Sequence, residues 1–192
     1  MKRYIIASIR MAIVTLVILG LAYPLAITGI AQVAFPSQAN GSLVRAANGR
    51  VLGSALIGQR FTEARYFHGR PSAAGADGYD PAASGASNLA PTSEALVSLV
   101  TSGVADAVVQ NPGLRAGAVP VDMVTASASG LDPDITLANA YAQVARVAKA
   151  RSLTEEQVRA IVEEHVTGRQ FGVLGEPRLN VLLLNLALDA AK

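Results

Sequence analysis

The hydropathy pattern begins with one long apolar stretch near the N-terminus. Residues 11–32 carry no charge, and residues 11–31 are apolar apart from Thr15, Thr28 and the hydroxyl of Tyr23. At about 1.5 Å per residue, a helix of this length spans roughly 30 Å, the thickness of a hydrocarbon core. Because backbone polar groups in lipid must be bonded internally, the pattern predicts a single transmembrane helix over residues 11–32.

The charges that flank this stretch predict its orientation. Lys2, Arg3 and Arg10 precede it, and the next charged residue is Arg45. Basic residues collect on the cytoplasmic side of membrane helices, so we expect residues 1–10 in the cytoplasm and residues 33–192 as an extracytoplasmic domain.

Two other interpretations of the apolar stretch compete with an anchor. A cleavable signal peptide is one, because Gly29-Ile30-Ala31 has small residues at the spacing of a cleavage site. The run is longer than the usual apolar region of about 7–15 residues in such peptides, and it contains Pro24. A buried core helix is the other, and it is disfavoured because all faces of the segment are apolar.

The first part of the domain predicts a hairpin and a long connector. Residues 43–46 and 50–52 flank Asn48-Gly49, the turn pair most typical of a β-hairpin, and residues 54–59 are expected to continue its second strand. Residues 62–93 are rich in Gly, Ala, Ser and Pro and predict an irregular connector. The aromatic residues within it argue against disorder.

The second part of the domain predicts helices. Apolar spacing indicates one helix from residue 91 or 92 to 109, and another from residue 134 or 136 to 151. A third begins with Thr154 and Gln157, which fit a capping box, and is expected to run to residue 166.

The segments between and after these helices are shorter. Residues 119–124 are typical of an extended run, and residues 126–134 of a turn region. Residues 179–188 are almost entirely apolar and predict a buried C-terminal helix or strand. The predicted fold class is α+β: one N-terminal transmembrane helix followed by a single, mostly helical domain with a small β-hairpin or sheet.

Composition limits the side chains expected in the core and the classes of partner expected for the chain. Hydrophobic residues make up 51% of the chain and aromatic residues 5%, so the core should consist of small aliphatic side chains. Of 16 basic residues three lie before the apolar stretch, which leaves 13 against 14 acidic residues in the remainder. This near-neutral balance argues against nucleic-acid binding. The absence of cysteine excludes disulfides and thiolate metal sites.

Catalytic motifs do not stand out. The chain has no Walker A motif, no recognisable aspartyl-phosphorylation motif and no Gly-x-Ser-x-Gly elbow. Its two histidines, His68 and His165, are far apart in sequence, and His165 is interpreted as a surface residue near a helix end. A membrane-anchored envelope hydrolase that uses Ser127 or Ser129 with His165 and an acidic partner is kept as an alternative.

Two polar segments are candidate binding sites. The first holds an aspartate and serine group, interpreted either as a binding or subunit-contact loop or as capping and turn residues: Asp122, Ser127, Ser129, Asp132 and Asp134. The second comprises Ser84, Gly85, Ser87 and Asn88, whose backbone N–H groups could cradle an anion. A flexible loop is the competing interpretation of this second segment.

Short motifs are spread along the chain from the apolar stretch to the C-terminus. They are Tyr23-Pro-Leu, Thr28-Gly-Ile-Ala-Gln, Phe35-Pro, Gln38-Ala-Asn-Gly-Ser, Leu56-Ile-Gly-Gln, Phe61, Tyr66-Phe, Arg70-Pro-Ser-Ala-Ala, Ser87-Asn-Leu, Pro91-Thr, Val119-Pro-Val-Asp, Val124-Thr-Ala-Ser-Ala-Ser-Gly-Leu-Asp-Pro and Gly175-Glu-Pro-Arg-Leu-Asn-Val-Leu. In number and order these motifs resemble the KdpC family, the C subunits of the Kdp high-affinity potassium-transporting P-type ATPase.

The resemblance implies an accessory, non-catalytic subunit of a potassium import complex in the bacterial inner membrane. Its implied partners are an A chain with the potassium pathway, a phosphorylated B chain, a small F chain and the lipid bilayer. It implies no cofactor of the chain's own, and ATP only through the B chain.

The resemblance also implies a possible role as a catalytic chaperone that raises the ATP affinity of the B chain through the Ser-Gly loop. Here Ala86 stands where the family often has glycine, and a final glutamine is lacking. That role requires a cytoplasmic domain, whereas the basic N-terminus favours an extracytoplasmic one. We therefore expect a domain that docks on the A chain, with an orphan envelope binding module as a further alternative.

Overall fold

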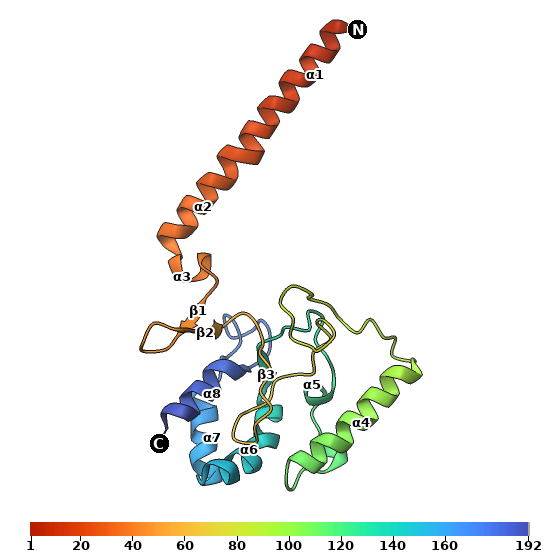
Figure 1. The fold of residues 1–192 in the computed structure, drawn as a ribbon, viewed down its shortest axis with the longest axis vertical. Coiled ribbons are helices and arrows are strands. Elements are labelled where there is room, and N and C mark those ends of the chain that lie inside the picture. Colours follow the sequence, from red (N-terminus) through yellow and green to blue (C-terminus); the bar gives the residue numbers. More distant parts are fainter. Residues whose placement is uncertain (192) are drawn as a thin grey trace. The chain divides into compact units, whose positions relative to one another are not determined.

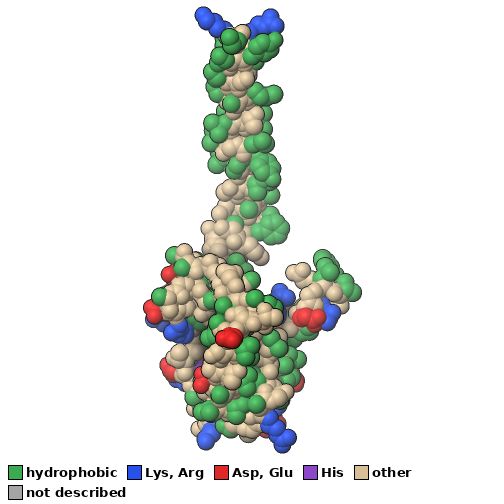
Figure 2. Space-filling view, turned by 90° about the vertical axis from the view of Figure 1, so that its right-hand side faces the viewer, with side chains coloured by type: hydrophobic (Ala, Val, Ile, Leu, Met, Phe, Trp, Pro, Cys, Tyr) green, Lys and Arg blue, Asp and Glu red, His purple; other side chains and the backbone are tan. Residues whose placement is uncertain are grey.

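The computed structural model describes residues 1–191, which form two units, residues 1–52 and residues 53 onward. The first unit begins with a continuous helix over Lys2–Ala34, composed of α1 (Lys2–Thr15), the π-helical stretch η1 (Leu16–Ala22) and α2 (Tyr23–Ala34) (Figure 1). It is long and apolar enough to cross a membrane. Its apolar side chains are exposed along its length, and basic residues stand at its N-terminal end (Figure 2). The predicted helix is confirmed, and it is longer at both ends.

Pro24 explains the position of the π-helical stretch. A proline lacks an N–H group, and its ring clashes with the carbonyl four residues earlier, which here belongs to Gly20 within η1. A π-type turn carries one more residue than an α-turn and so moves that carbonyl away from the ring. The helix therefore continues past the proline instead of breaking there.

A short hairpin follows the helix α3 (Pro36–Ala39). Strands β1 (Leu43–Arg45) and β2 (Val51–Ser54) pair, and Gly49 takes the positive φ of +81° that the turn requires. This confirms the hairpin. The prediction that its second strand reaches residue 59 is wrong, because the N–H groups of Leu56 and Ile57 turn back to bond the Ser54 hydroxyl and carbonyl.

The second unit contains the remaining elements. They are α4 (Glu94–Gln110), the 3₁₀ turn η2 (Ala116–Ala118), α5 (Val121–Val124), β3 (Asp134–Thr136), α6 (Leu137–Arg151), α7 (Glu155–Glu164), β4 (Arg178–Asn180) and α8 (Val181–Ala190). Strands β3 and β4 pair antiparallel, with Ile135 opposite Leu179. Helices α6, α7 and α8 gather together, whereas α4 stands at the edge of the unit (Figure 1). The α+β class is confirmed.

The core of this unit lies between α6, α7, α8 and strands β3 and β4. As the composition predicts, it consists mainly of small aliphatic side chains, with one aromatic ring from the connector. Its fully buried members include Phe67, Val144, Val147, Val158, Val162, Leu179, Leu184 and Leu188. The apolar segment at residues 179–188 is thus a buried helix preceded by a short strand.

Local capping signals position two of the core helices. The Thr136 side chain accepts a hydrogen bond from the N–H of Asn139 at the start of α6. Thr154 and Gln157 form the predicted capping box of α7, which ends two residues earlier than expected, at Glu164. Helix α4 likewise begins a few residues later than predicted, after Ser93.

The prediction of an extended run at residues 119–124 is wrong, since residues 121–124 form α5. The Asp122 carboxylate, only 8% exposed, accepts hydrogen bonds from the Thr136 N–H (2.8 Å), the Thr136 hydroxyl (3.0 Å) and the Asn139 amide (3.1 Å). These contacts, made to the start of α6, hold the segment in a helical turn.

Candidate functional site

The long connector is held against the core by two side-chain amides. Asn185 of α8 accepts from the Phe67 N–H (2.8 Å) and donates to the Phe67 carbonyl (2.9 Å). Gln143 of α6 does the same for His68, at 2.8 Å and 3.0 Å. Each amide therefore satisfies both backbone polar groups of one residue, as a neighbouring strand would. The connector is irregular, as predicted, but its central part is fixed.

Arg146 of α6 lies at the centre of this arrangement and is only 7% exposed. Its Nη1 donates to the carbonyls of Ala64 (2.7 Å) and Tyr66 (2.9 Å) and lies 3.3 Å from Nε2 of His68. Its Nε donates to Asn111 Oδ1 at 3.1 Å, beyond the end of α4. Its Nη2 donates to Gln143 Oε1 at 2.5 Å. One guanidinium thus joins the connector, α4 and α6.

Asn139, Gln143 and Arg146 form a polar stripe along α6 that was not among the predicted sites. Gln143 Nε2 donates to Asn139 Oδ1 at 2.7 Å, and Asn139 in turn donates to the buried Asp122. Residues 139, 143 and 146 share one helix face. The signal in the sequence that could have found the site was three polar residues at positions i, i+4 and i+7 of an alanine-rich predicted helix.

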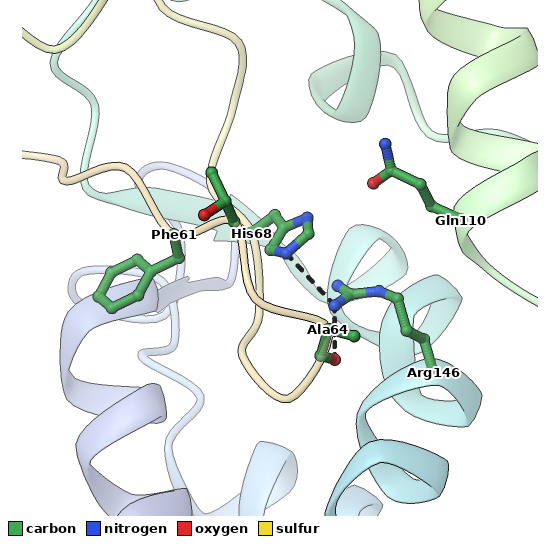
Figure 3. Close-up of a pocket in the computed structure, with 6 residues that line it drawn as sticks. Phe61, Ala64, His68, Gln110 and Arg146 are labelled. Atoms are coloured by element: carbon green, nitrogen blue, oxygen red, sulfur yellow. Dashed lines mark hydrogen bonds between the residues drawn. The ribbon is translucent and has the colours of Figure 1, made fainter.

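A pocket of about 400 Å³ opens beside the guanidinium. Its lining residues are Phe61, Thr62, Ala64, His68, Gln110 and Arg146. Figure 3 shows the His68 ring next to the Arg146 guanidinium, with the Gln110 side chain reaching from α4 toward them. A second pocket of about 240 Å³ shares His68 and Gln110, so both pockets lie along the groove between the connector and the end of α4.

The electrostatics of the pocket are unusual. Burial lowers the pKa of Arg146 to about 10, so the guanidinium remains protonated at neutral pH. Burial and the charge of Arg146 also lower the pKa of His68, so its ring is neutral at pH 7. Among residues 1–191 no acidic side chain forms an ion pair with Arg146. The pocket therefore has one buried positive charge and neutral walls.

The predicted anion loop lies elsewhere in the domain. The Ser84 hydroxyl and the Gly85 N–H both donate to the Ser129 carbonyl at 2.9 Å. Ser87 and Asn88 are exposed, and Asn88 has a positive φ of +52°. The first half of the loop is thus packed against residues 129–130. Nucleotide binding by the loop stays a prediction.

The aspartate and serine group is divided among internal contacts. Asp132 pairs with Arg70 at 3.0 Å, and Asp134 pairs with Arg178 at 2.9 Å. The Ser129 hydroxyl accepts from the Leu131 N–H at 3.1 Å, as a turn residue does. Together with the contacts of Asp122, these bonds match the capping and turn interpretation.

The serine and histidine residues of the hydrolase alternative do not form a catalytic pair. The hydroxyls of Ser127 and Ser129 lie 3.4 Å from each other, whereas His165 Nδ1 lies 2.8 Å from the Ile161 carbonyl of its own helix. Throughout the described part of the chain, neither serine hydrogen-bonds to His165. Glu155, Glu156, Glu163 and Glu164 are exposed, as expected for a solvated helix face.

Comparison with known proteins connects this geometry to one family. Residues 5–190 match the model of the family described as KdpC, the c chain of K⁺-transporting ATPase. A potassium-transporting ATPase KdpC subunit of Gemmatimonas aurantiaca is 57% identical over 190 residues, which cover 99% of this chain and 94% of the relative. The KdpC subunit of Koribacter versatilis is 53% identical over 192 residues, covering 100% of this chain and 97% of that relative.

Proposed function

Since the chain belongs to the KdpC family, the c chains of K⁺-transporting ATPases, we propose that its domain holds the transport complex together from the extracytoplasmic side. Membership makes the chain an accessory subunit of a potassium-transporting ATPase complex and not its catalytic chain. Its partners in the proposal are the A, B and F chains, with the domain docked on the A chain that carries the potassium pathway. The complex lies in the bacterial inner membrane.

An exposed apolar tip supports the docking role. Residues 170–174 form a tight turn closed by two backbone hydrogen bonds of 2.9 Å between Gln170 and Leu174. Phe171 is 93% exposed, Val173 72% and Leu174 56%. An ion pair of 2.6 Å between Arg169 and Glu176 braces the base of the turn.

The conformation of this tip favours a partner. Phe171 has a positive φ of +52°, which costs a non-glycine residue about 1 kcal/mol or more. A strained, exposed aromatic side chain gains nothing from its own domain, and rigid apolar anchors of this kind dominate the binding energy of protein interfaces. We infer that the tip of residues 170–174 is buried against another subunit of the complex.

Replacing Phe171 with aspartate should release the chain from its complex without unfolding it. Loss of an interface anchor is expected to cost about 2 kcal/mol, or about thirtyfold in affinity. The measurement is recovery of the other subunits with a tagged chain after membrane solubilisation. Ala160→Asp, an equal charge change on the exposed face of α7, is the control and should leave recovery unchanged. If both variants recover the other subunits equally, the tip is not part of the docking surface.

The membrane helix is the second proposed contact. Thr28 and Gly29 lie in α2, and a Cβ at Gly29 would meet no atom within 4 Å. Small residues and hydroxyls let membrane helices approach closely, so this face could pack against a helix of a partner chain.

The orientation of the domain decides between assembly and ATP-affinity roles. The chain has no cysteine, so single cysteines can be introduced cleanly at Ser87 in the Ser84–Asn88 loop and at Tyr4 near the N-terminus. With an impermeant maleimide and intact cells we expect the Ser87→Cys variant to be labelled and the Tyr4→Cys variant to be labelled only after lysis. The reverse pattern would contradict the outward placement. It would instead support nucleotide binding by Ser84, Gly85, Ser87 and Asn88 and a role in the ATP affinity of the B chain.

A further inference from the structure

We propose that the pocket beside Arg146 is a binding site for a carboxylate group. The site lies within the domain alone and does not depend on how the complex assembles. Arg146 is only 7% exposed, and within residues 1–191 its guanidinium has no acidic partner. Buried charges are normally paired, because removing an ion from water is costly.

The hydrogen bonds of Arg146 leave one donor available. A guanidinium has five N–H groups. Four are matched by Asn111 Oδ1, the carbonyls of Ala64 and Tyr66, and Gln143 Oε1. For the second N–H of Nη2, the described residues provide no acceptor. The four groups that accept these hydrogen bonds are all uncharged, so they orient the guanidinium without cancelling its charge.

The opposite wall offers a neutral donor. Gln110 is exposed at the last turn of α4 and lines the pocket, and its amide group can donate into it. The His68 ring lies beside Arg146, with Nε2 3.3 Å from Nη1, and Figure 3 shows its other nitrogen on the side of Gln110. Nε2 also lies 3.1 Å from the Glu63 carbonyl oxygen, which can only accept, so the neutral ring carries its proton on Nε2 and presents the other nitrogen as an acceptor on the side of Gln110.

The charge balance selects a carboxylate over a phosphate. One guanidinium neutralises one carboxylate, whereas a phosphate group brings about −1.5 to −2 charges at neutral pH. Arg146 is the only basic side chain among the residues that line this pocket, apart from the neutral His68. Asp106 lines only the adjoining pocket. Phe61 and Ala64 provide apolar surface for the carbon atoms of the group.

The site can be tested without disturbing the Arg146 clamp. Gln110→Glu would place an internal carboxylate in the pocket at an exposed position. Val109→Glu adds the same charge to the adjacent, 84% exposed residue, which does not line the pocket. Both substitutions add an acidic residue to the last turn of α4, so any effect of the helix dipole is shared.

Acetate is the probe, added to the full-length chain in detergent. The chain has two histidines, so nitrogen NMR of the imidazole rings reports on His68 and uses His165 as an internal control. We expect saturable shifts of the His68 signals alone for the wild-type chain and for Val109→Glu. Gln110→Glu should bind acetate at least about tenfold more weakly, because its own carboxylate occupies the site. An equimolar phosphate titration should give weaker binding than acetate.

Two outcomes would overturn the proposal. One is the absence of a saturable His68 shift in the wild-type chain, and the other is equal acetate binding by Gln110→Glu and Val109→Glu. Recovery of the other subunits with each variant distinguishes two sources of the natural carboxylate. If an acidic side chain of a partner fills the pocket, Gln110→Glu will lower recovery of the other subunits relative to Val109→Glu. If the ligand is a dissolved carboxylate, the two variants will recover them equally.

Discussion

Replacing Arg146 with alanine should lower the free energy of unfolding of the second unit by about 3–5 kcal/mol. The substitution removes the donor shared by the carbonyls of Ala64 and Tyr66 and by the side chains of Asn111 and Gln143. Asn111 and Gln143 are buried, and a buried acceptor left without a partner costs about 1–3 kcal/mol, whereas the carbonyl of the exposed Ala64 can bond to water. Domains of this size are stable by about 5–15 kcal/mol, so the loss would be large.

Urea unfolding of the full-length chain in detergent, followed by circular dichroism, measures this effect. Arg159→Ala is the matched control, because Arg159 is half-exposed and its ion pair with Glu155 spans 3.6 Å. A surface pair of this kind is worth less than about 1 kcal/mol. Arg146→Lys should fall between the two, since lysine keeps the charge but loses the planar fork. If Arg146→Ala and Arg159→Ala cost the same, the guanidinium does not clamp the connector.

The second large effect is expected for Gly130→Ala. Gly130 has a positive φ of +67°, and a Cβ there would lie 2.7 Å from both the Ala74 nitrogen and the Gly85 carbonyl oxygen. These neighbours are backbone atoms that cannot rotate away. Backbone strain of about 1–3 kcal/mol adds to a similar cost of overpacking, so we expect a loss of about 3–5 kcal/mol.

Gly172→Ala separates these two contributions. Gly172 has a similar φ of +77°, but a Cβ there would meet nothing within 4 Å. It should therefore show the strain alone, about 1 kcal/mol. The same urea experiment compares the two variants. Equal losses would mean that the close approach of the connector to residues 127–132 contributes nothing to stability.

Both predictions concern the connector, residues 62–93. Composition alone predicted its irregular structure, and its aromatic residues indicated order, but its anchors were not predictable. Phe67 is held by Asn185, which is 118 residues away in sequence, and Arg146 reaches Ala64 across 82 residues. No local pattern encodes such pairs, because the polar groups meet only after α6 and α8 have packed.

Features that depend on neighbours in sequence were determined by the sequence itself. The apolar stretch of residues 11–31 specifies a helix because hydrophobicity and internal hydrogen bonding act on each turn separately. Asn48-Gly49 specifies the hairpin turn, and Thr154 with Gln157 specifies the start of α7, for the same reason. The family motifs are also a property of the sequence alone.

Only the tertiary structure decided the rest. Residues 121–124 are helical because the Asp122 carboxylate bonds the start of α6, although the local pattern favours an extended run. The strands β3 and β4 are three residues each and are defined by their pairing with one another. The Arg146 pocket combines residues from the connector, α4 and α6. A buried charge requires partners from several directions at once, and a single segment of chain cannot supply them, so this site exists only in the folded domain.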